Sequence, residues 1–118
     1  MPAPRYDLED RLINLAVQIC VLTDRLPSTQ IAKHVAAQVI RSGTSPFANY
    51  GEAHAAESRQ DCVHKLEVCL KELRETQAWL QFIQRMNRCS ESVETVSREG
   101  DELVAILATS VRTAAGKM

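Results

Sequence analysis

The sequence predicts an all-α fold, an antiparallel four-helix bundle whose helices run up, down, up and down. The 118 residues include only four glycines and four prolines, and aromatic residues make up 4% of the chain. A composition poor in helix breakers and rich in alanine, leucine, glutamate and arginine favours helix over strand. Apolar residues recur at alternating spacings of three and four in four long segments, which is the pattern of helices that share one core. We expect one domain over residues 1–118, with helices at about 7–26, 29–57, 59–87 and 90–114.

The first expected helix, at about 7–26, has two apolar stripes. The seam consists of Leu8, Leu12, Leu15, Ile19, Leu22 and Leu26. The second stripe, beside it, consists of Ile13, Val17, Cys20 and Val21. A helix in a monomeric bundle needs only one apolar face, so the second stripe predicts an interface with another subunit. The alternative is a single seam that is broad.

The second expected helix, at about 29–57, passes through the least regular stretch of the chain. Gly43, Pro46 and Gly51 indicate a loop there. The apolar spacing nevertheless continues in phase through Ile31, Val35, Val39, Pro46, Asn49 and Ala53. We therefore expect one long helix, bent near Gly43–Pro46 because proline removes a backbone donor and clashes with the carbonyl four residues earlier. Two helices split in this region are the alternative.

The third and fourth expected helices continue the same spacing. The third seam consists of Cys62, Leu66, Cys69, Leu73, Thr76, Leu80 and Ile83, and the fourth of Val93, Val96, Gly100, Leu103, Leu107 and Ser110. Trp79 and Phe82 lie beside the third seam, and an exposed pair would leave a large apolar patch in water. We expect them to pack against the fourth helix or a neighbouring subunit. Gly100 predicts a close approach to another backbone.

Charge and cysteine content limit the functional classes. The net charge is −1, without the excess of lysine and arginine typical of a nucleic-acid binder. No apolar run has the length of a membrane span, and no apolar signal core follows the first residues, so we expect a cytoplasmic protein without membrane contact. The cysteines form no Cys-x-x-Cys pair and are expected to be reduced thiols in the core. They are Cys20, Cys62, Cys69 and Cys89.

Several short pieces, in order along the chain, resemble a known family. They are Tyr6-Asp7-Leu8-Glu9, Leu26-Pro27, Arg41-Ser42-Gly43-Thr44-Ser45, Asn49-Tyr50-x-Glu52-Ala53, Asp61-x-x-His64-Lys65-Leu66, Leu70-Lys71-Glu72 and Glu75-x-x-x-Trp79-Leu80. The chain resembles the small bacterial four-helix-bundle proteins called ribosomal-protein-like, some of which are encoded in intervening sequences of large-subunit ribosomal RNA genes. The likeness covers about residues 6–82.

The resemblance implies a ring-like homo-oligomer, a pentamer, with no established biochemical role. It also implies kinship with the accessory variability proteins of diversity-generating retroelements, which bind nucleic acid and a reverse transcriptase. Those proteins are markedly basic, and this chain is not.

Polar residues on the second and third helices form the first candidate site. They are Arg41, Asn49, Glu52, Lys65, Glu72 and Glu75. In antiparallel packing Glu52 reaches Lys65, and Arg41 reaches Glu72 or Glu75. One interpretation is a polar network that fixes the register of the helices. The other is a site for a ligand or a partner.

Metal and catalytic sites are not expected. His54 and Glu57, and then Asp61 and His64, each place two metal ligands one turn apart, but both pairs flank one turn, whereas di-iron bundles use ligands from all four helices. No glycine-rich phosphate loop and no activated nucleophile are evident. We expect no cofactor and no enzymatic activity.

A basic surface is the second candidate site. It comprises Arg59, Lys65, Lys71, Arg74, Arg85 and Arg88. Glutamates 67, 72 and 75 interleave with these residues, which is typical of a solvated face of mixed charge. In a ring, symmetry repeats the same residues into a basic collar. The leading hypothesis is thus an oligomeric interaction or scaffold protein, and the alternative is a nucleic-acid-binding accessory protein.

Overall fold

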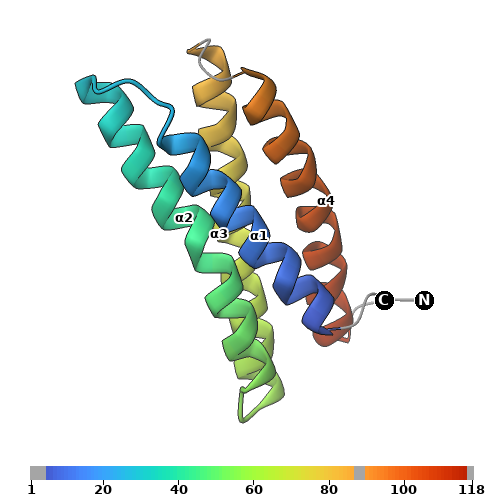
Figure 1. The fold of residues 1–118 in the computed structure, drawn as a ribbon. Helices are drawn as coiled ribbons and strands as arrows, with labels where there is room; N and C mark the ends of the chain where they lie inside the picture. The colour runs from blue at the N-terminus through green and yellow to red at the C-terminus, as the bar shows by residue number, and fades with distance from the viewer. Residues whose placement is uncertain (1–4, 87–89, 117–118) are drawn as a thin grey trace.

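The computed structural model describes residues 5–86 and 90–116, and this part of the chain forms four α-helices and no strand. They are α1 (Arg5–Thr23), α2 (Gln30–His54), α3 (Arg59–Arg85) and α4 (Ser90–Ala114). Consecutive helices run antiparallel in a bundle of 44 × 26 × 22 Å, and short turns join α1 to α2 and α2 to α3 (Figure 1). The predicted all-α four-helix bundle is confirmed.

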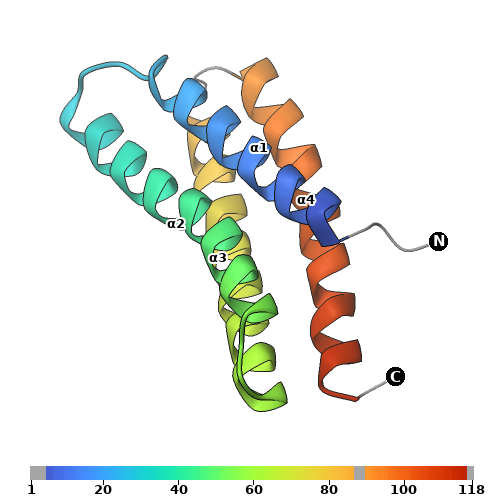
Figure 2. The same ribbon diagram turned by 60° about the horizontal axis from the view of Figure 1, so that its bottom comes forward.

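Each helix packs against two others around the core. α1 lies between α2 and α4, and α3 lies between the same two helices on the other side. α1 and α3 are therefore diagonal to each other, as the two ribbon views show together (Figures 1 and 2). The start of α1 and the end of α4 lie at the same end of the bundle.

Side-chain caps define the beginnings of two helices. The Thr29 hydroxyl accepts a hydrogen bond from the Ala32 N–H at 3.2 Å, and the Ser58 hydroxyl accepts one from the Asp61 N–H at 3.0 Å. Such caps satisfy amide donors that have no partner within the helix. α1 and α2 each end three residues earlier than predicted, at Thr23 and at His54.

The core is built from the predicted seams of α1, α3 and α4. Its largest fully buried side chains are Leu12, Leu15, Ile19, Leu22, Leu73, Leu80, Ile83, Leu103, Leu107, Val35, Val39 and Val93. Leu26, predicted as the last seam position of the first helix, follows the end of α1 and is only half-buried. Cys62 and Ser110, predicted seam positions of the third and fourth helices, are also only half-buried. The 3–4 spacing therefore located most of the core of α1, α3 and α4.

α2 runs without interruption through Gly43 and Pro46. This confirms the single long helix over the split alternative, whereas the bend near Pro46 stays a prediction. Two predicted core positions are wrong by one residue. Ile31 is exposed and Ala32 is buried in its place, and Asn49 is half-buried while Tyr50 faces the core. The sequence spacing did not fix the rotation of α2 because small residues occupy much of its inner face.

The small residues of α2 let its neighbours approach closely. A β-carbon at Gly43 would lie 2.6 Å from Cδ1 of Ile19, so any larger residue would displace this core side chain of α1. On the α3 side, the Thr76 hydroxyl donates to the Ser42 hydroxyl at 2.9 Å, and both residues are fully buried. This short polar contact satisfies two buried hydroxyls between helices.

Gly100 makes room for a side chain, not for the backbone contact that we expected. A β-carbon there would lie 2.6 Å from Cδ of Gln77 on α3. The Gln77 amide nitrogen donates to the Ser97 carbonyl and to Oδ1 of Asp101, both at 2.8 Å. Oε1 of Gln77 is the one buried side-chain polar atom without a hydrogen bond among the described residues. It occupies the space beside Gly100, 2.0 Å from where a β-carbon would lie.

Candidate interaction surfaces

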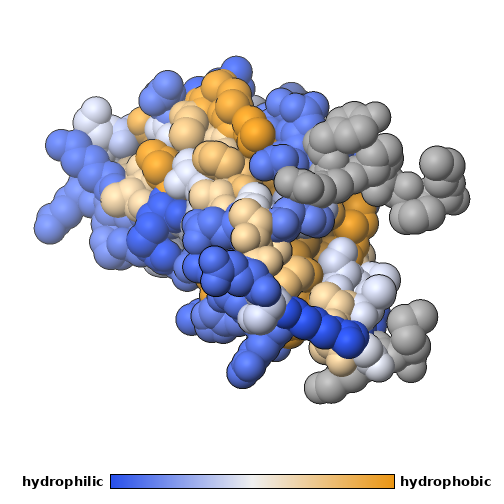
Figure 3. All heavy atoms as spheres, turned by 90° about the horizontal axis from the view of Figure 1, so that it is seen from below, coloured by the Kyte–Doolittle hydropathy of each residue, from blue (hydrophilic) through white to orange (hydrophobic). Residues whose placement is uncertain are grey.

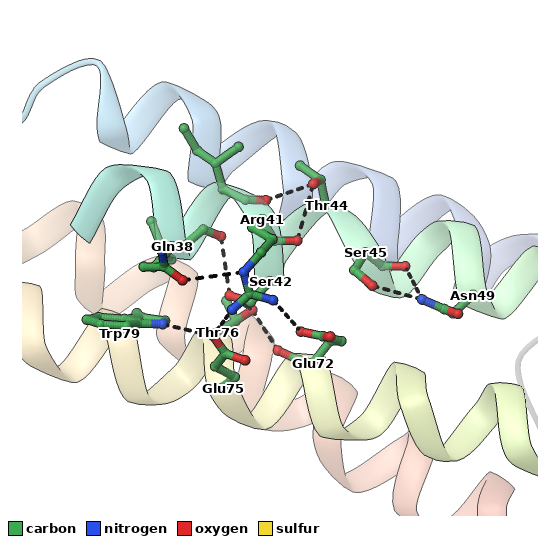
Figure 4. A network of polar contacts seen from close by, with 12 residues as sticks. Gln38, Arg41, Ser42, Thr44, Ser45, Asn49, Glu72, Glu75, Thr76 and Trp79 are labelled. Carbon is green, nitrogen blue, oxygen red and sulfur yellow. Dashed lines mark hydrogen bonds and ion pairs between the residues drawn. The ribbon is translucent and has the colours of Figure 1, made fainter. Parts of the chain in front are cut away.

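Arg41 is the centre of a polar network between α2 and α3 (Figure 4). Its guanidinium forms ion pairs with Glu75 and, at 3.3 Å, with Glu72. Gln38, one turn earlier on α2, accepts a hydrogen bond from Nε of Arg41 at 3.4 Å. Both expected partners of Arg41 are thus engaged at once, and the network joins the middle of the two helices.

The indole of Trp79 extends this network. Its Nε1 donates to Glu75 at 3.1 Å, and its ring makes edge contacts with His34, at 6.0 Å between centroids, and with Phe82, at 5.9 Å. Trp79 therefore packs against α2, whereas we had expected helix four or a second subunit, because it lies on the edge of α3 that faces α2. Phe82 remains 42% exposed.

The remaining members of the predicted polar cluster lie apart from Arg41. Asn49 donates to the carbonyl and the hydroxyl of Ser45 within its own helix, at 3.1 and 2.8 Å. Lys65 pairs with Glu52 at 2.9 Å, nearer the turn between α2 and α3. The hydrogen bond to Glu52 raises the pKa of Lys65. The six residues therefore form two ion-pair groups between α2 and α3 and one pair of hydrogen bonds within α2.

A third ion-pair group, between α1 and α4, was missed in the sequence. Arg11 binds Glu99 through two hydrogen bonds, at 3.0 and 2.9 Å, and Glu102 through an ion pair at 3.1 Å. The pKa of Arg11 is raised, mainly because of the bidentate hydrogen bond to Glu99. Arg11 and Glu99 are 88 residues apart, and no local pattern in the sequence predicts such a pair.

The second apolar stripe of α1 lies on the side of the helix away from the core. Val17 is 55% exposed, Val21 50% and Ile13 39%, while Cys20 is half-buried. Val17 lies five residues from both Leu12 and Leu22, which turns it about 140° around the helix from these core side chains. A broad seam therefore does not account for the stripe. Val17 and Val21 also line a groove of about 310 Å³ between α1 and α4.

The predicted basic residues divide into paired and unpaired side chains. Arg59 donates to the carbonyl of Ala114 at 2.7 Å, at the end of α4, and Lys65 is held by Glu52. The exposed side chains of Lys71, Arg74 and Arg85 form no ion pair with another described residue. Arg88 lies outside the described residues.

The cysteines at positions 20, 62 and 69 are free thiols, and Cys89 lies outside the described residues. Cys69 is fully buried, and its thiol donates to the carbonyl of Pro46 at 3.3 Å. Burial raises the pKa of Cys69 to about 12. Within the part of the chain that the structure describes, no three histidine, cysteine or acidic side chains lie close enough together to hold a metal ion.

The surface mixes polar and apolar side chains. Seen from below, hydrophobic residues reach the surface among hydrophilic ones (Figure 3). None of the described helices combines the length and the hydropathy of a bilayer-spanning segment.

Comparisons with known proteins agree with this architecture. A family model described as 23S rRNA-intervening sequence protein matches residues 6–109. Among solved structures, the chain is similar to a protein of unknown function from the S23 ribosomal protein family of Bacteroides thetaiotaomicron. The two chains are 32% identical with a TM-score of 0.83, and the match covers 92% of this chain and 97% of that one. A search of curated proteins gave no match. The chain belongs to the 23S rRNA-intervening sequence protein family.

Proposed function

We propose that this protein is a non-enzymatic interaction scaffold that works as a homo-oligomer. The observation that carries the proposal is the exposed aliphatic stripe of Ile13, Val17 and Val21 on the outer side of α1. These three β-branched side chains lie at neighbouring positions along a helix whose opposite side already fills the core, and about half of each remains in contact with water.

Burial of the stripe supplies a driving force for assembly. Full burial of a valine or isoleucine side chain contributes about 1.5–3 kcal/mol. About half of each of the three side chains is still exposed in the single chain, so about half of this free energy is available for association. Burial of the whole stripe in one contact therefore contributes roughly 3 kcal/mol before the cost of association. Further contacts around it are therefore required, as in most protein interfaces.

Several polar groups of the bundle contribute to holding the helices together. Arg41, Gln77 and Arg11 each join two helices through hydrogen bonds or ion pairs. This arrangement supports a rigid scaffold. The resemblance described above leads us to expect a closed ring of five subunits.

Light scattering of the purified protein tests the proposal. The wild type is expected to have a mass several times the 13.2 kDa of one chain. Val17→Glu places a charge in the stripe and should give a single-chain mass with unchanged helicity. Ala105→Glu is the matched control, because Ala105 is exposed on α4 and does not belong to the stripe. A wild type of single-chain mass at every concentration would refute the proposal.

Nucleic-acid binding is the second candidate function. The observation that favours it is a set of exposed cations on α3 that form no ion pair with a described carboxylate. They are Lys71, Arg74 and Arg85. Several chains in one assembly would multiply these contacts.

Fluorescence anisotropy with structured RNA and with duplex DNA, over a salt series, tests this second function. Each phosphate contact contributes a slope of about −0.9 to log K against log salt for duplex DNA. Arg74→Gln should reduce the slope by about one for each chain in contact, and Gln81→Ala, on the same helix, should leave it unchanged. Absence of binding at low salt would exclude this function and direct the search to protein partners.

A further inference from the structure

We propose that the outer face of α1 docks on the outer face of α3 of a second copy of this chain, head to tail. The inference rests on the self-association proposed above and names its two surfaces. We call them the α1 face (Asp10, Ile13, Val17, Val21, Asp24) and the α3 face (Lys71, Arg74, Ala78, Phe82, Arg85).

The α1 face is an aliphatic stripe with an acid at each end. Asp10 and Asp24 are exposed, and neither forms an ion pair with another described residue. The N–H of Asp24 donates to the carbonyl of Cys20, so the helical path continues to this residue. Asp10 and Asp24 are fourteen positions apart, which is about 21 Å along a helix. Arg25, at the side of the stripe, is hydrogen-bonded to Ser92 on α4.

The α3 face has the opposite charge at the same spacing. Lys71 and Arg85 are also fourteen positions apart, about 21 Å, and both are exposed. Between them lie the small exposed Ala78, at the midpoint, and Phe82. Arg74 adds a third cation.

Two carboxylates lie near these cations. Glu67 lies one turn before Lys71 and is exposed. Glu75 is bound by Arg41 and Trp79. The α3 face therefore keeps a positive excess.

These two patterns are complementary in charge, in length and in shape. If the acids of one copy pair with the bases of the next, Val17, the midpoint of the first face, lies opposite Ala78, where a small side chain leaves room for it. Phe82 then meets Ile13 when the helices cross antiparallel, or Val21 when they cross parallel. Complementary charges at the ends fix the register of such a contact, and apolar contacts at its centre provide most of its affinity.

The placement of the two faces selects a head-to-tail contact. α1 and α3 are diagonal in the bundle, without close backbone contact between them (Figures 1 and 2). The residues of both faces are exposed in the same chain. Pairing α1 with α1 of another copy would bring aspartates together at both ends, because antiparallel pairing sets Asp10 against Asp24. A contact between unlike faces leaves one of each free, and repeated addition closes a ring or extends a fibre.

Mixing two variants tests the inference. Val17→Glu blocks only the α1 face and Ala78→Glu blocks only the α3 face, so each is expected to weaken self-association about tenfold or more and to give single-chain mass. An equimolar mixture retains one intact face on each partner. It should form a 1:1 heterodimer of twice the 13.2 kDa of one chain, and no larger species. A mixture that stays at single-chain mass would overturn the inference.

The charges provide a second, independent test. Lys71→Glu with Arg85→Glu should weaken assembly, and adding Asp10→Lys with Asp24→Lys in the same chain should restore it. Exchanging the charges of only one pair distinguishes the two crossing directions. Asp10 pairs with Arg85 when the two helices cross antiparallel, and with Lys71 when they cross parallel. Failure of the fourfold variant to assemble, with wild-type helicity by circular dichroism, would contradict the pairing.

The outcomes separate this inference from the proposed function. A wild type that is a single chain at all concentrations refutes self-association itself. A wild type that assembles, together with an Ala78→Glu variant that assembles equally well, refutes only the α3 face as the partner of α1. In that case α3 is available for another partner, such as RNA. Ala105→Glu controls for the added charge, since Ala105 is exposed on α4 and belongs to neither face.

Discussion

Gly100→Ala is expected to destabilise the protein, although helix propensity alone predicts the opposite. Alanine is favoured over glycine in a helix interior by about 1 kcal/mol. At this position, however, the new β-carbon would lie 2.6 Å from Cδ of Gln77. The amide must then move and lose its bonds to the Ser97 carbonyl and to Asp101. The ordinary hydrogen bond to the Ser97 carbonyl contributes about 1 kcal/mol, and the one to the charged Asp101 about 1.5–3 kcal/mol. Their loss outweighs the gain in helix propensity, so the free energy of unfolding should fall by about 2 kcal/mol.

The reasoning can be tested by removing the obstacle. In a Gln77→Ala background no amide lies beside position 100, so Gly100→Ala should there stabilise the protein by up to about 1 kcal/mol. The free energy of unfolding, from urea titrations at one protein concentration, gives the coupling between the two positions. We expect a coupling of about 3 kcal/mol, far above the roughly 0.5 kcal/mol within which independent sites add. Stabilisation by Gly100→Ala in the wild-type background, with additive effects, would refute the steric argument.

Two further predictions concern Cys69 and Arg41. Burial raises the pKa of Cys69 to about 12 from an ordinary 9.0, so the unfolded chain releases this proton first. The contribution of the Cys69 thiol to stability is therefore complete below about pH 9 and falls by about 1.4 kcal/mol per pH unit as the pH rises towards 12. Urea titrations at pH 8 and pH 10 should show this loss in the wild type and not in Cys69→Ala. The same pH dependence in both proteins would contradict the prediction. Arg41→Met leaves Glu72 and Glu75 without their cation. We therefore expect the free energy of unfolding to fall by about 1 kcal/mol in dilute buffer, and by less in 1 M salt. A decrease independent of salt would mean that packing of the arginine stem, not its charge, is responsible.

Much of the fold could be predicted because the hydrophobic pattern is a local property. Leu12, Leu15 and Ile19 recur at helical spacing, and a helix with such a stripe must bury it against others. The ion pairs Lys65–Glu52 and Arg41–Glu72 could also be anticipated, since antiparallel helices joined by a short turn bring these positions together. The order of short motifs was enough to indicate the family.

The sequence by itself therefore determined the helices, their order and most of the core residues of α1, α3 and α4. Only the tertiary structure decided which side of α2 faces inward, that Trp79 packs against α2, that Gly100 accommodates Gln77, and that Arg11 reaches Glu99 across the bundle. The physical reason is that helix formation and amphipathicity depend on neighbours within a turn or two. The rotation of a helix and the partners of its polar groups depend instead on the shapes of surfaces that are far apart in the chain. For the same reason, only the tertiary structure shows that Val17 faces away from the core.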